Sequence, residues 1–394
     1  MRRFCSRFSA ASLVLVAALA CAGCGGNGKD KTGEVAKSPV PMHRDDVAPP
    51  GTDWSMFRGD PAQTGVAVDT LPDKLSRLWT HDSKSYIDGT AAIVGNTVYI
   101  GTGDGRLLAL RLDTGEPRWS YEATTAVSSG VCVDNGRVFF GDLGGVFHAV
   151  DAATGKKLWT LETQGKIVSS AVVSDGGVLF GSYDGTLYCL EASSGEKRWT
   201  FETSAPVHAS PCLVDGRVTI GGCDMVLRFI DVKTGEEQGA VELGSNVASA
   251  PACRDGRVYV GTLDGTIRCV DATKLTTSWT VEDPMLGEIH ASPAVGPWGA
   301  IFATRGGTVL CLAPDGKEKW RFATRGANDS SPVVSGARVF FGSSDGKLYA
   351  LDIEKGDLVW SFTAGAGISS SPAAGRGRLV IAAEDGAVFC FGAK

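Results

Sequence analysis

Tryptophan recurs along this chain at an interval of about forty residues. Seven of the nine tryptophans share that spacing: Trp79, Trp119, Trp159, Trp199, Trp279, Trp320 and Trp360. Gly239 stands where the series would place another tryptophan, so the interval continues through a position without an aromatic side chain. A fixed period of this length indicates an internal structural repeat, and it constrains the fold more than any single motif does.

Each repeat contains three turn signals separated by short apolar segments. The first two turns usually carry Asn-Gly or Asp-Gly, as at residues 135–136 and 264–265, and the third carries Thr-Gly or a related pair. Asn-Gly and Asp-Gly tolerate the positive φ that tight hairpins require. The segments between them, such as RVFFG and TLYCLE, are typical of strands. The repeat therefore predicts four short antiparallel strands, which is the pattern of a β-propeller blade.

The spacing also predicts the number of blades. Seven intervals separate Trp79 from Trp360, and the residues after Trp360 suffice for three more strands. The segment LSRLW at 75–79 can supply the missing fourth strand, which would leave no sheet edge unpaired. We expect an all-β, eight-bladed β-propeller of four-stranded antiparallel blades at 75–394, its ring closed by the N-terminal strand joining the last blade.

The N-terminus has the features of a targeting segment. Three arginines precede a short apolar run, SAASLVLVAALACAGC, which is too short for a stable membrane span. Its ending in small residues and cysteine resembles a bacterial lipoprotein signal, with Cys24 as the lipidated residue and Cys21 as the alternative. An ordinary cleaved secretory signal is the other interpretation. We expect a lipoprotein signal peptide at 1–24.

The next segment, 25–50, is polar, rich in proline and glycine and free of aromatic residues, so we expect a disordered tether. A lead-in segment at 51–74 would connect it to the propeller. The net charge of the chain is −6, and removal of the three leader arginines would make it about −9. Without a basic run, this charge argues against nucleic acid as a partner.

The motif T-G-x-x-x-W after an aliphatic strand, as in DAATGKKLW at 151–159, resembles the PQQ-like propeller repeat. The segment WSMFRGDPAQTG at 54–65 resembles the lead-in of many secreted PQQ-like repeat proteins, so we interpret its Arg-Gly-Asp as part of that motif rather than as an adhesion tripeptide. The resemblance covers about 71–394. It implies that the repeated tryptophans pack between neighbouring blades.

Quinone-dependent dehydrogenases share this repeat. The resemblance to them implies long insertions, a vicinal Cys-Cys pair, and acidic and amide ligands for Ca²⁺. This sequence has no Cys-Cys dipeptide, and its repeats vary by a residue or two, which leaves little with which to wall off a cofactor pocket. We therefore expect no catalytic residue, no metal and no cofactor; PQQ with Ca²⁺ is the alternative.

Eight cysteines follow residue 24, and their positions favour packing. Four of them occupy one third-strand position, where three other repeats have Ala109, Ala149 and Ala350: Cys189, Cys269, Cys311 and Cys390. Cys253 and Cys269 would lie on the first and third strands of one blade, too far apart for a disulfide. No C-x-x-C spacing indicates a metal site.

Repeats differ most at the residue that begins each innermost strand. In register, these residues are Asp88, Ser128, Val168, His208, Ala248, His290, Asp329 and Ser369. They would encircle one mouth of the central channel. The sixth and seventh repeats depart most, through a two-residue insertion in EDPMLGEIH at 282–290 and through unusual loop residues.

We identify six candidates for binding an anionic small molecule or an acidic peptide at this mouth: His208, His290, Arg305, Arg325, Asn328 and Asp329. Loop variation without function is the alternative interpretation. On the opposite face, Trp298 is either an exposed aromatic anchor for a partner or folds back onto the blade edge. A glycan-binding module ranks last, because the repeat leaves only Trp54 and Trp298 as free aromatic platforms.

The lipid anchor, size, eight blades and short loops resemble the BamB family, lipoproteins of the outer-membrane β-barrel assembly machinery whose propeller binds the barrel-inserting subunit. The resemblance implies a non-catalytic, monomeric scaffold for a protein partner, anchored to the outer membrane and facing the periplasm. VELGSNVASAP at 241–251 lacks an arginine- or leucine-rich contact loop, so the resemblance supports the architecture better than the specific partner. A periplasmic quinoprotein or small-ligand sensor is the alternative function.

Overall fold

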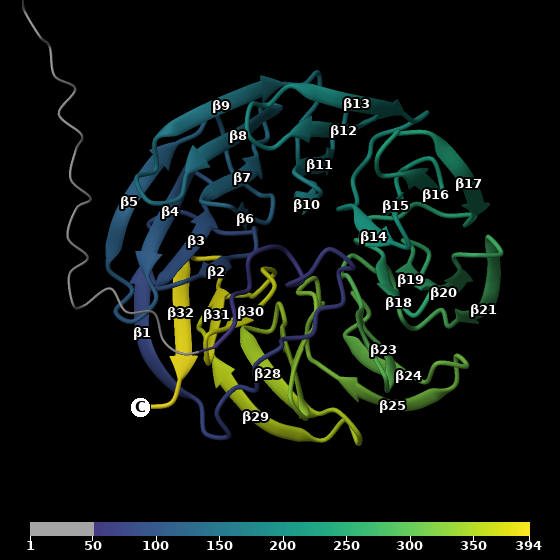
Figure 1. Ribbon diagram of the computed structural model, residues 1–394. Coiled ribbons are helices and arrows are strands. Elements are labelled where there is room, and N and C mark those ends of the chain that lie inside the picture. The colour runs from purple at the N-terminus through teal and green to yellow at the C-terminus, as the bar shows by residue number, and fades with distance from the viewer. Residues whose placement is uncertain (1–50) are drawn as a thin grey trace, which may run out of the picture. The chain divides into compact units, whose positions relative to one another are not determined.

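The computed structural model describes residues 51–394, which form eight separate four-stranded sheets arranged around a central axis (Figure 1). The expected signal peptide at 1–24, the tether at 25–50 and both candidate lipidation residues, Cys21 and Cys24, lie outside the described residues. Within residues 51–394, no helix has the length and apolar character needed to cross a membrane.

Strands of four kinds follow one another in each sheet. The innermost strands are β2 (Ala92–Val94), β6 (Cys132–Asp134), β10 (Val172–Ser174), β14 (Cys212–Val214), β18 (Ala252–Arg254), β22 (Ala294–Gly296), β26 (Val333–Ser335) and β30 (Ala373–Gly375). The second strands are β3 (Thr97–Gly101), β7 (Arg137–Gly141), β11 (Gly177–Gly181), β15 (Arg217–Ile220), β19 (Arg257–Gly261), β23 (Gly299–Ala303), β27 (Arg338–Gly342) and β31 (Arg378–Ala382). The third strands are β4 (Arg106–Arg111), β8 (Val146–Asp151), β12 (Thr186–Glu191), β16 (Val226–Asp231), β20 (Thr266–Asp271), β24 (Thr308–Leu312), β28 (Lys347–Asp352) and β32 (Ala387–Gly392). The outer strands are β5 (Pro117–Glu122), β9 (Lys157–Glu162), β13 (Lys197–Glu202), β17 (Glu237–Glu242), β21 (Thr276–Glu282), β25 (Glu318–Ala323), β29 (Leu358–Thr363) and β1 (Ser76–Asp82).

The last blade is assembled from the two ends of the propeller. Its sheet runs in the order β1-β32-β31-β30, with Trp79 opposite Cys390 and Thr80 opposite Phe389. Every sheet is antiparallel, and we number the blades from β2–β5 as blade 1 to this closing sheet as blade 8. The predicted eight-bladed architecture and its closure by an N-terminal strand are therefore confirmed.

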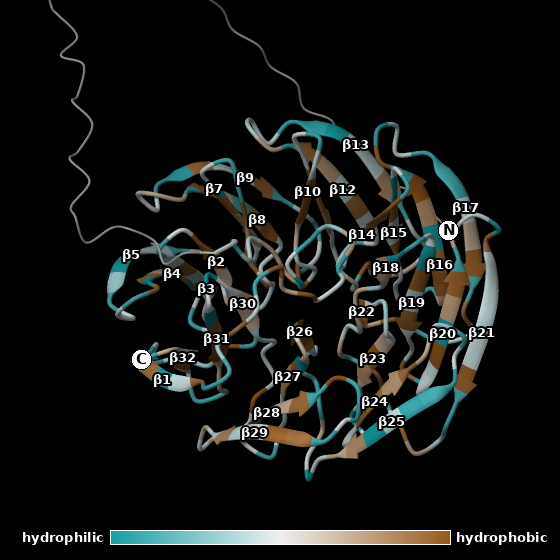
Figure 2. Ribbon diagram, turned by 60° about the horizontal axis from the view of Figure 1, so that its bottom comes forward, coloured by the Kyte–Doolittle hydropathy of each residue, from teal (hydrophilic) through white to brown (hydrophobic). Residues whose placement is uncertain are grey.

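Burial follows the position of a strand within its blade. The second and third strands are buried on both faces, as in β11, whose residues are all buried, because each blade is covered by a neighbour on either side. The outer strands instead alternate between half-buried and exposed residues, as in β9. Figure 2 shows the result: the inner strands are mostly hydrophobic, whereas outer strands such as β13 and β25 carry hydrophilic stretches.

Six of the repeated tryptophans join one blade to the next. Each indole Nε1 donates a hydrogen bond of 2.8–3.2 Å to a backbone carbonyl of the following blade, 33 or 35 residues later: Trp79, Trp119, Trp159, Trp199, Trp279 and Trp320. Each ring also packs on the glycine of the following blade's third turn. At Gly155 an added Cβ would lie 2.5 Å from the Trp119 ring, so this turn accepts only glycine without rearrangement. The inter-blade packing of these tryptophans is thus confirmed.

Gly239 and Leu275 explain the interruption of the tryptophan series. Gly239 lies on the outer strand of blade 4, and Leu275 stands at the third turn of blade 5, where other blades have glycine. A Cβ on Gly239 would overlap Leu275 Cδ1. Here the small residue and the large one have exchanged blades, so this interface lacks the indole hydrogen bond of its neighbours.

The lead-in segment runs across the ends of the innermost strands, as the dark purple trace near the centre of Figure 1 shows. Its backbone bonds to seven of the eight blades, from Trp54 with Ile93 in blade 1 to Thr52 with Arg376 in blade 8. Its end is held by Arg338, whose Nη2 donates to the carbonyls of Leu71 and Pro72 at 2.7 and 2.9 Å. This segment is an integral part of the propeller and occupies one end of its channel.

The exchange of sizes at Gly239 and Leu275 can be tested by reversing it. Gly239→Trp should destabilise the chain because the indole would overlap Leu275, and Leu275→Gly because it empties that space; we expect about 1–3 kcal/mol for each. The double variant restores the arrangement of the other interfaces. Its loss in the free energy of unfolding should therefore be smaller than the sum of the losses of the two single variants by at least about 1 kcal/mol. Urea unfolding of the four proteins measures this, and additive losses would contradict the size relation.

Candidate functional site

The central channel opens into a cavity of about 210 Å³. Its lining includes, from all eight blades, the residue that lies four positions before the innermost strand: Asp88, Ser128, Val168, His208, Ala248, His290, Asp329 and Ser369. The sequence predicted that these residues begin the innermost strands, but each lies in the connection that leads to its strand. The ring defined from the sequence register is therefore the ring that surrounds the cavity. We call the surface around it the mouth face.

The mouth face consists of two kinds of connection. One leads from each outer strand to the next innermost strand, and the other joins the second and third strands. They lie side by side because the backbone N–H of each such turn donates to the preceding connection, as Tyr183 does to Lys166 and Arg305 to Glu288. The insertion in the sixth repeat therefore changes this face.

Serines below the ring hold the blades together. The hydroxyl oxygen in one blade accepts a backbone N–H from the preceding blade at 2.8–3.0 Å in five places: Ser170 from Gly130, Ser210 from Ser170, Ser292 from Ala250, Ser331 from Ser292, and Ser371 from Ser331. These serines also line the cavity. One acceptor position of each hydroxyl is thus used between blades, so the lining serines stabilise the ring.

The lead-in closes the far end of this cavity. Phe57 is among the lining residues, and the neighbouring Arg58 is buried, with its Nη2 donating to the Pro293 carbonyl at 2.9 Å. Burial lowers the pKa of Arg58 to about 9, an effect that the nearby Asp60 carboxylate partly offsets. The guanidinium therefore stays charged at neutral pH. The cavity is a blind pocket, open toward the mouth face.

A chain of charged side chains borders the mouth. Arg305 Nε donates to Asp329 Oδ1 at 2.7 Å and its Nη1 to Glu288 Oε2 at 3.2 Å, while His290 Nε2 lies 2.8 Å from the same Glu288 oxygen. The Asp329 carboxylate raises the pKa of Arg305, and the bond from His290 lowers the pKa of Glu288. Both signs of charge are present, so these side chains form a mixed network that includes Glu288. Binding of an anionic molecule or an acidic peptide there stays a prediction.

The other predicted mouth residues have separate surroundings. Asn328 is buried, and its Nδ2 donates to the Thr304 carbonyl at 3.3 Å, so it supports the loop and is not a surface contact. Arg325 is exposed beside Asp345, whose carboxylate accepts its backbone N–H. The structure therefore joins His290, Arg305 and Asp329, and leaves Asn328 and Arg325 outside their network.

His208 lines the same cavity and is hydrogen-bonded through Nδ1 to the Tyr183 hydroxyl. Burial, with smaller contributions from His290 and Lys166, lowers the pKa of His208 to about 4. The imidazole is therefore neutral at pH 7. Lys166 Nζ lies 4.3 Å from the centre of the Tyr183 ring, which fixes that ring from outside.

The two remaining candidate aromatic platforms are covered. Trp298 is half-buried at the turn after β22, and its ring lies so close to Gly296 that an added Cβ there would overlap it. Of the two alternatives left open for Trp298, the structure shows the one in which it folds back onto its blade. Trp54 is buried under the lead-in. Neither offers the exposed face that a glycan-binding platform needs.

The insertion of the sixth repeat presents a methionine that sequence reasoning missed. Met285 is 77% exposed, while its neighbour Leu286 is buried and anchors the loop. Asp283 shapes the turn by accepting the backbone N–H of Met285 at 2.9 Å. Two further apolar side chains, Tyr86 and Met225, are exposed in connections of the mouth face. The two-residue insertion was the signal that could have pointed to this side chain.

A buried acid–histidine pair is the second feature that sequence reasoning missed. Asp142, in the turn between β7 and β8, accepts four backbone N–H groups and lies 3.1 Å from His148 Nε2. The Tyr121 hydroxyl lies 3.1 Å from His148 Nδ1. Burial raises the pKa of Asp142, but the bonds from His148 and the backbone outweigh it and hold that pKa below its ordinary range.

The side chains and the size of the cavity bear on the alternative in which a quinone and a metal ion bind there. Among residues 51–394, no three His, Cys, Asp or Glu side chains form a group that could hold a metal. The cavity is smaller than the roughly 300 Å³ at which pockets for drug-sized molecules begin, and its serines are engaged between blades. Cys189, Cys269, Cys311 and Cys390 are buried, as their packing role requires.

Comparison with known proteins relates the chain to two propeller families. A family model described as the β-propeller of beta-alanine-activating enzyme matches residues 135–394. A second, described as outer membrane protein assembly factor BamB, matches residues 66–171. Over 80 residues the chain is 35% identical to BamB of Vibrio cholerae serotype O1, covering 19% of this chain and 21% of that protein. The match thus spans about a fifth of the length of this curated relative.

Two solved structures show the extent of the shared fold. BamB from Moraxella catarrhalis aligns with a TM-score of 0.70 and 21% identity, over 82% of this chain and 98% of that one. The quinohemoprotein alcohol dehydrogenase of Comamonas testosteroni aligns with a TM-score of 0.72 and 16% identity, over 87% and 81%. At these identities the likeness shows the fold alone, and it is shared by an assembly factor and an enzyme.

Removing one lining hydroxyl tests whether the serines serve the ring. Ser170→Ala leaves the buried N–H of Gly130 without its acceptor, so we expect a loss of about 1–2 kcal/mol in the free energy of unfolding. Ser369→Ala is the matched control, because that lining hydroxyl has no hydrogen-bond partner among the described residues. It should change stability by less than about 0.5 kcal/mol. Equal effects in chemical denaturation would contradict the structural role of Ser170.

Asp142→Asn tests the buried pair through its pH dependence. The carboxylate has a lowered pKa in the folded chain, so it contributes stability above the unfolded-state value of about 4, and loses that contribution as pH falls through the folded pKa. We expect the variant to be less stable at pH 7 by about 2 kcal/mol. The difference from wild type should shrink below pH 4. Denaturant unfolding at several pH values measures this difference in the free energy of unfolding. A difference that does not change with pH would contradict this assignment.

Proposed function

This chain belongs to the PQQ-like β-propellers, with the propeller of beta-alanine-activating enzyme and BamB as its relatives, and on that premise we propose that it is a non-catalytic scaffold of the bacterial envelope. It would be anchored by lipid at Cys24, or alternatively at Cys21, in the outer membrane. It would face the periplasm and bind a protein partner through the mouth face.

The blind cavity is the observation that carries this proposal. The lead-in fills one end of the channel, and the hydroxyls of the lining serines bond from blade to blade. What remains, about 210 Å³, is open to the mouth face and bordered by internally paired charges. An enzyme of this fold needs an enclosed cofactor pocket, whereas a scaffold needs a rigid outer surface. Rigid blades with short connections supply such a rigid outer surface.

At blades 5 to 7 the mouth face combines an exposed apolar side chain with a polar border, as a protein-binding surface does. Met285 projects from a loop that Asp283 and the buried Leu286 hold in place, so its side chain is presented without a large ordering cost. Beside it, Arg305 and Glu288 form a polar border that is 44% and 52% exposed. A flexible apolar side chain next to paired charges suits a partner segment with one apolar residue flanked by polar ones.

The relation to BamB suggests the class of partner. BamB is an outer membrane protein assembly factor, and this chain matches the BamB family model over residues 66–171 and a BamB sequence over 80 residues. We therefore propose that the partner belongs to the machinery that assembles outer-membrane β-barrels. The alternative is a small polar ligand seated in the blind cavity, which the neutral His208 and the free face of the serine ring would favour.

Crosslinking from native envelopes tests the scaffold. We would compare the full-length lipidated chain with Met285→Ser/Arg305→Ser, which removes the apolar anchor and one charge of the border. The matched control is Leu358→Ser, an apolar residue 50% exposed on β29. We expect the wild type and the control to recover barrel-assembly components. The mouth-face variant should recover them in an amount lower by at least about tenfold.

Two other results would count against the proposal. If the wild type recovered no envelope protein, the scaffold would lose its support, and the cavity would be the next subject. Calorimetric titration with PQQ and Ca²⁺ would then decide the quinone alternative. If both variants recovered partners equally, the contact would lie away from the mouth face.

A further inference from the structure

Neighbouring blades meet at a fixed pair of positions on their innermost strands. The first residue of one innermost strand shares an apolar cluster with the second residue of the innermost strand in the next blade. The pairs are Ala92 with Val133, Cys132 with Val173, Ala252 with Val295, Ala294 with Val334, Val333 with Ala374, and Ala373 with Ile93. Between blades 4 and 5, this pair is Cys212 with Cys253.

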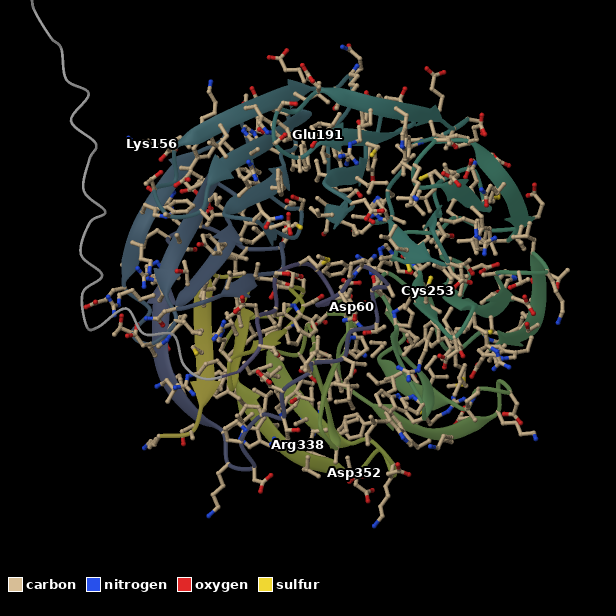
Figure 3. The ribbon with its side chains drawn as sticks, in the orientation of Figure 1. Asp60, Lys156, Glu191, Cys253, Arg338 and Asp352 are labelled. Atoms are coloured by element: carbon tan, nitrogen blue, oxygen red, sulfur yellow. The ribbon has the colours of Figure 1, made fainter. Side chains whose placement is uncertain are left out.

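The two sulfur atoms lie in direct contact. Cys212 Sγ and Cys253 Sγ are 2.6 Å apart, about 0.5 Å beyond the covalent S–S length of roughly 2.05 Å. Both side chains are buried, and they come from adjacent innermost strands, β14 and β18. Figure 3 labels Cys253 in the inner part of its blade and Asp60 of the lead-in nearer the centre of the ring. The structure describes both residues as thiols.

The same interface is the one where Gly239 and Leu275 replace the tryptophan and its glycine. Blades 4 and 5 therefore meet without the indole hydrogen bond that joins six other pairs of blades. The cysteine pair lies at the inner end of this interface, and the missing tryptophan at the outer end. The lead-in also passes here, since the Ala62 carbonyl accepts the Cys253 N–H at 2.8 Å.

We propose that Cys212 and Cys253 form a disulfide that links blade 4 to blade 5. The S–H bonds of both cysteines break, one Sγ–Sγ bond forms, and two electrons and two protons pass to the oxidant. That oxidant is itself a disulfide, of an oxidoreductase in the envelope or of oxidised glutathione in a test tube, and it is reduced to two thiols. The bond closes a loop of the chain across the interface that lacks a tryptophan.

This assignment differs from the sequence-based one, which tested only two cysteines of the same blade. Cys253 and Cys269 indeed lie on the first and third strands, whereas the partner of Cys253 comes from the preceding blade. Burial raises the pKa of Cys212 well above its ordinary value, so the thiol is unreactive once the blades have packed. The bond must therefore form while the chain folds.

The oxidant in the cell rests on the proposed envelope location, so the experiment has two arms. In the first, the purified chain is unfolded, reduced and refolded in a mixture of reduced and oxidised glutathione. In the second, the chain is isolated from envelopes with thiols blocked at lysis. Both samples are unfolded and alkylated, then reduced and alkylated with an isotopically different reagent, and each cysteine is scored by mass spectrometry.

We expect Cys212 and Cys253 to carry the second label in both arms, while the buried thiols of Cys311 and Cys390 carry the first. If both members of the pair carry the first label after refolding, the disulfide is wrong. If they carry the second label after refolding but the first in the envelope sample, the disulfide stands and the proposed orientation toward the periplasm fails.

A stability measurement gives an independent readout. Reduction should lower the Tm of the oxidised wild type by about 5 °C, and Cys253→Ser should show that lower Tm with no further response to reductant. Cys311→Ser is the matched control: it replaces a buried thiol that has no sulfur partner within residues 51–394, so it should keep the response to reductant. A wild type that does not respond to reductant would overturn the proposal.

Discussion

Contact between the faces of neighbouring blades is the interaction on which this structure depends. A four-stranded blade is apolar on both faces and cannot be stable alone, because the second and third strands would expose both to water. Each blade therefore needs two neighbours, and only a closed ring gives two neighbours to all eight. The indole of one blade packed on the glycine of the next fixes the spacing of that contact at the rim, and the serine hydroxyls fix it at the axis.

The periodicity of the sequence made the fold predictable. An interval of forty residues, three turn signals and a spare strand at 75–79 sufficed to predict eight blades and their closure through β1. The reason for glycine at 239 was not predictable from its own repeat, because it depends on the leucine that stands at 275 in the following one. Whether two side chains at an interface between blades fit in size depends on both residues. The repeat pattern describes each blade by itself and does not show this fit.

The site was predictable to the level of the backbone. Register alone placed eight residues around the cavity, because the innermost strands begin at the same height in every blade. The partners of their side chains were not predictable. Glu288 joins His290 to Arg305, Asn328 turns inward, and Cys212 meets Cys253, each across a boundary between blades or connections. Such contacts depend on rotamers and on packing between segments far apart in sequence.

The lead-in has a consequence for how this chain folds. Its hydrogen bonds reach from Ile93 to Arg376, so a segment made early finds its last partners almost at the end of the chain. Contacts of such long sequence separation form late and are paid for by loop-closure entropy. The strand β1 likewise pairs only with β32, near the end of the chain. The N-terminal part of the ring is therefore fully paired only after the last blade has formed. A chain that stops short of it leaves its own beginning unpaired.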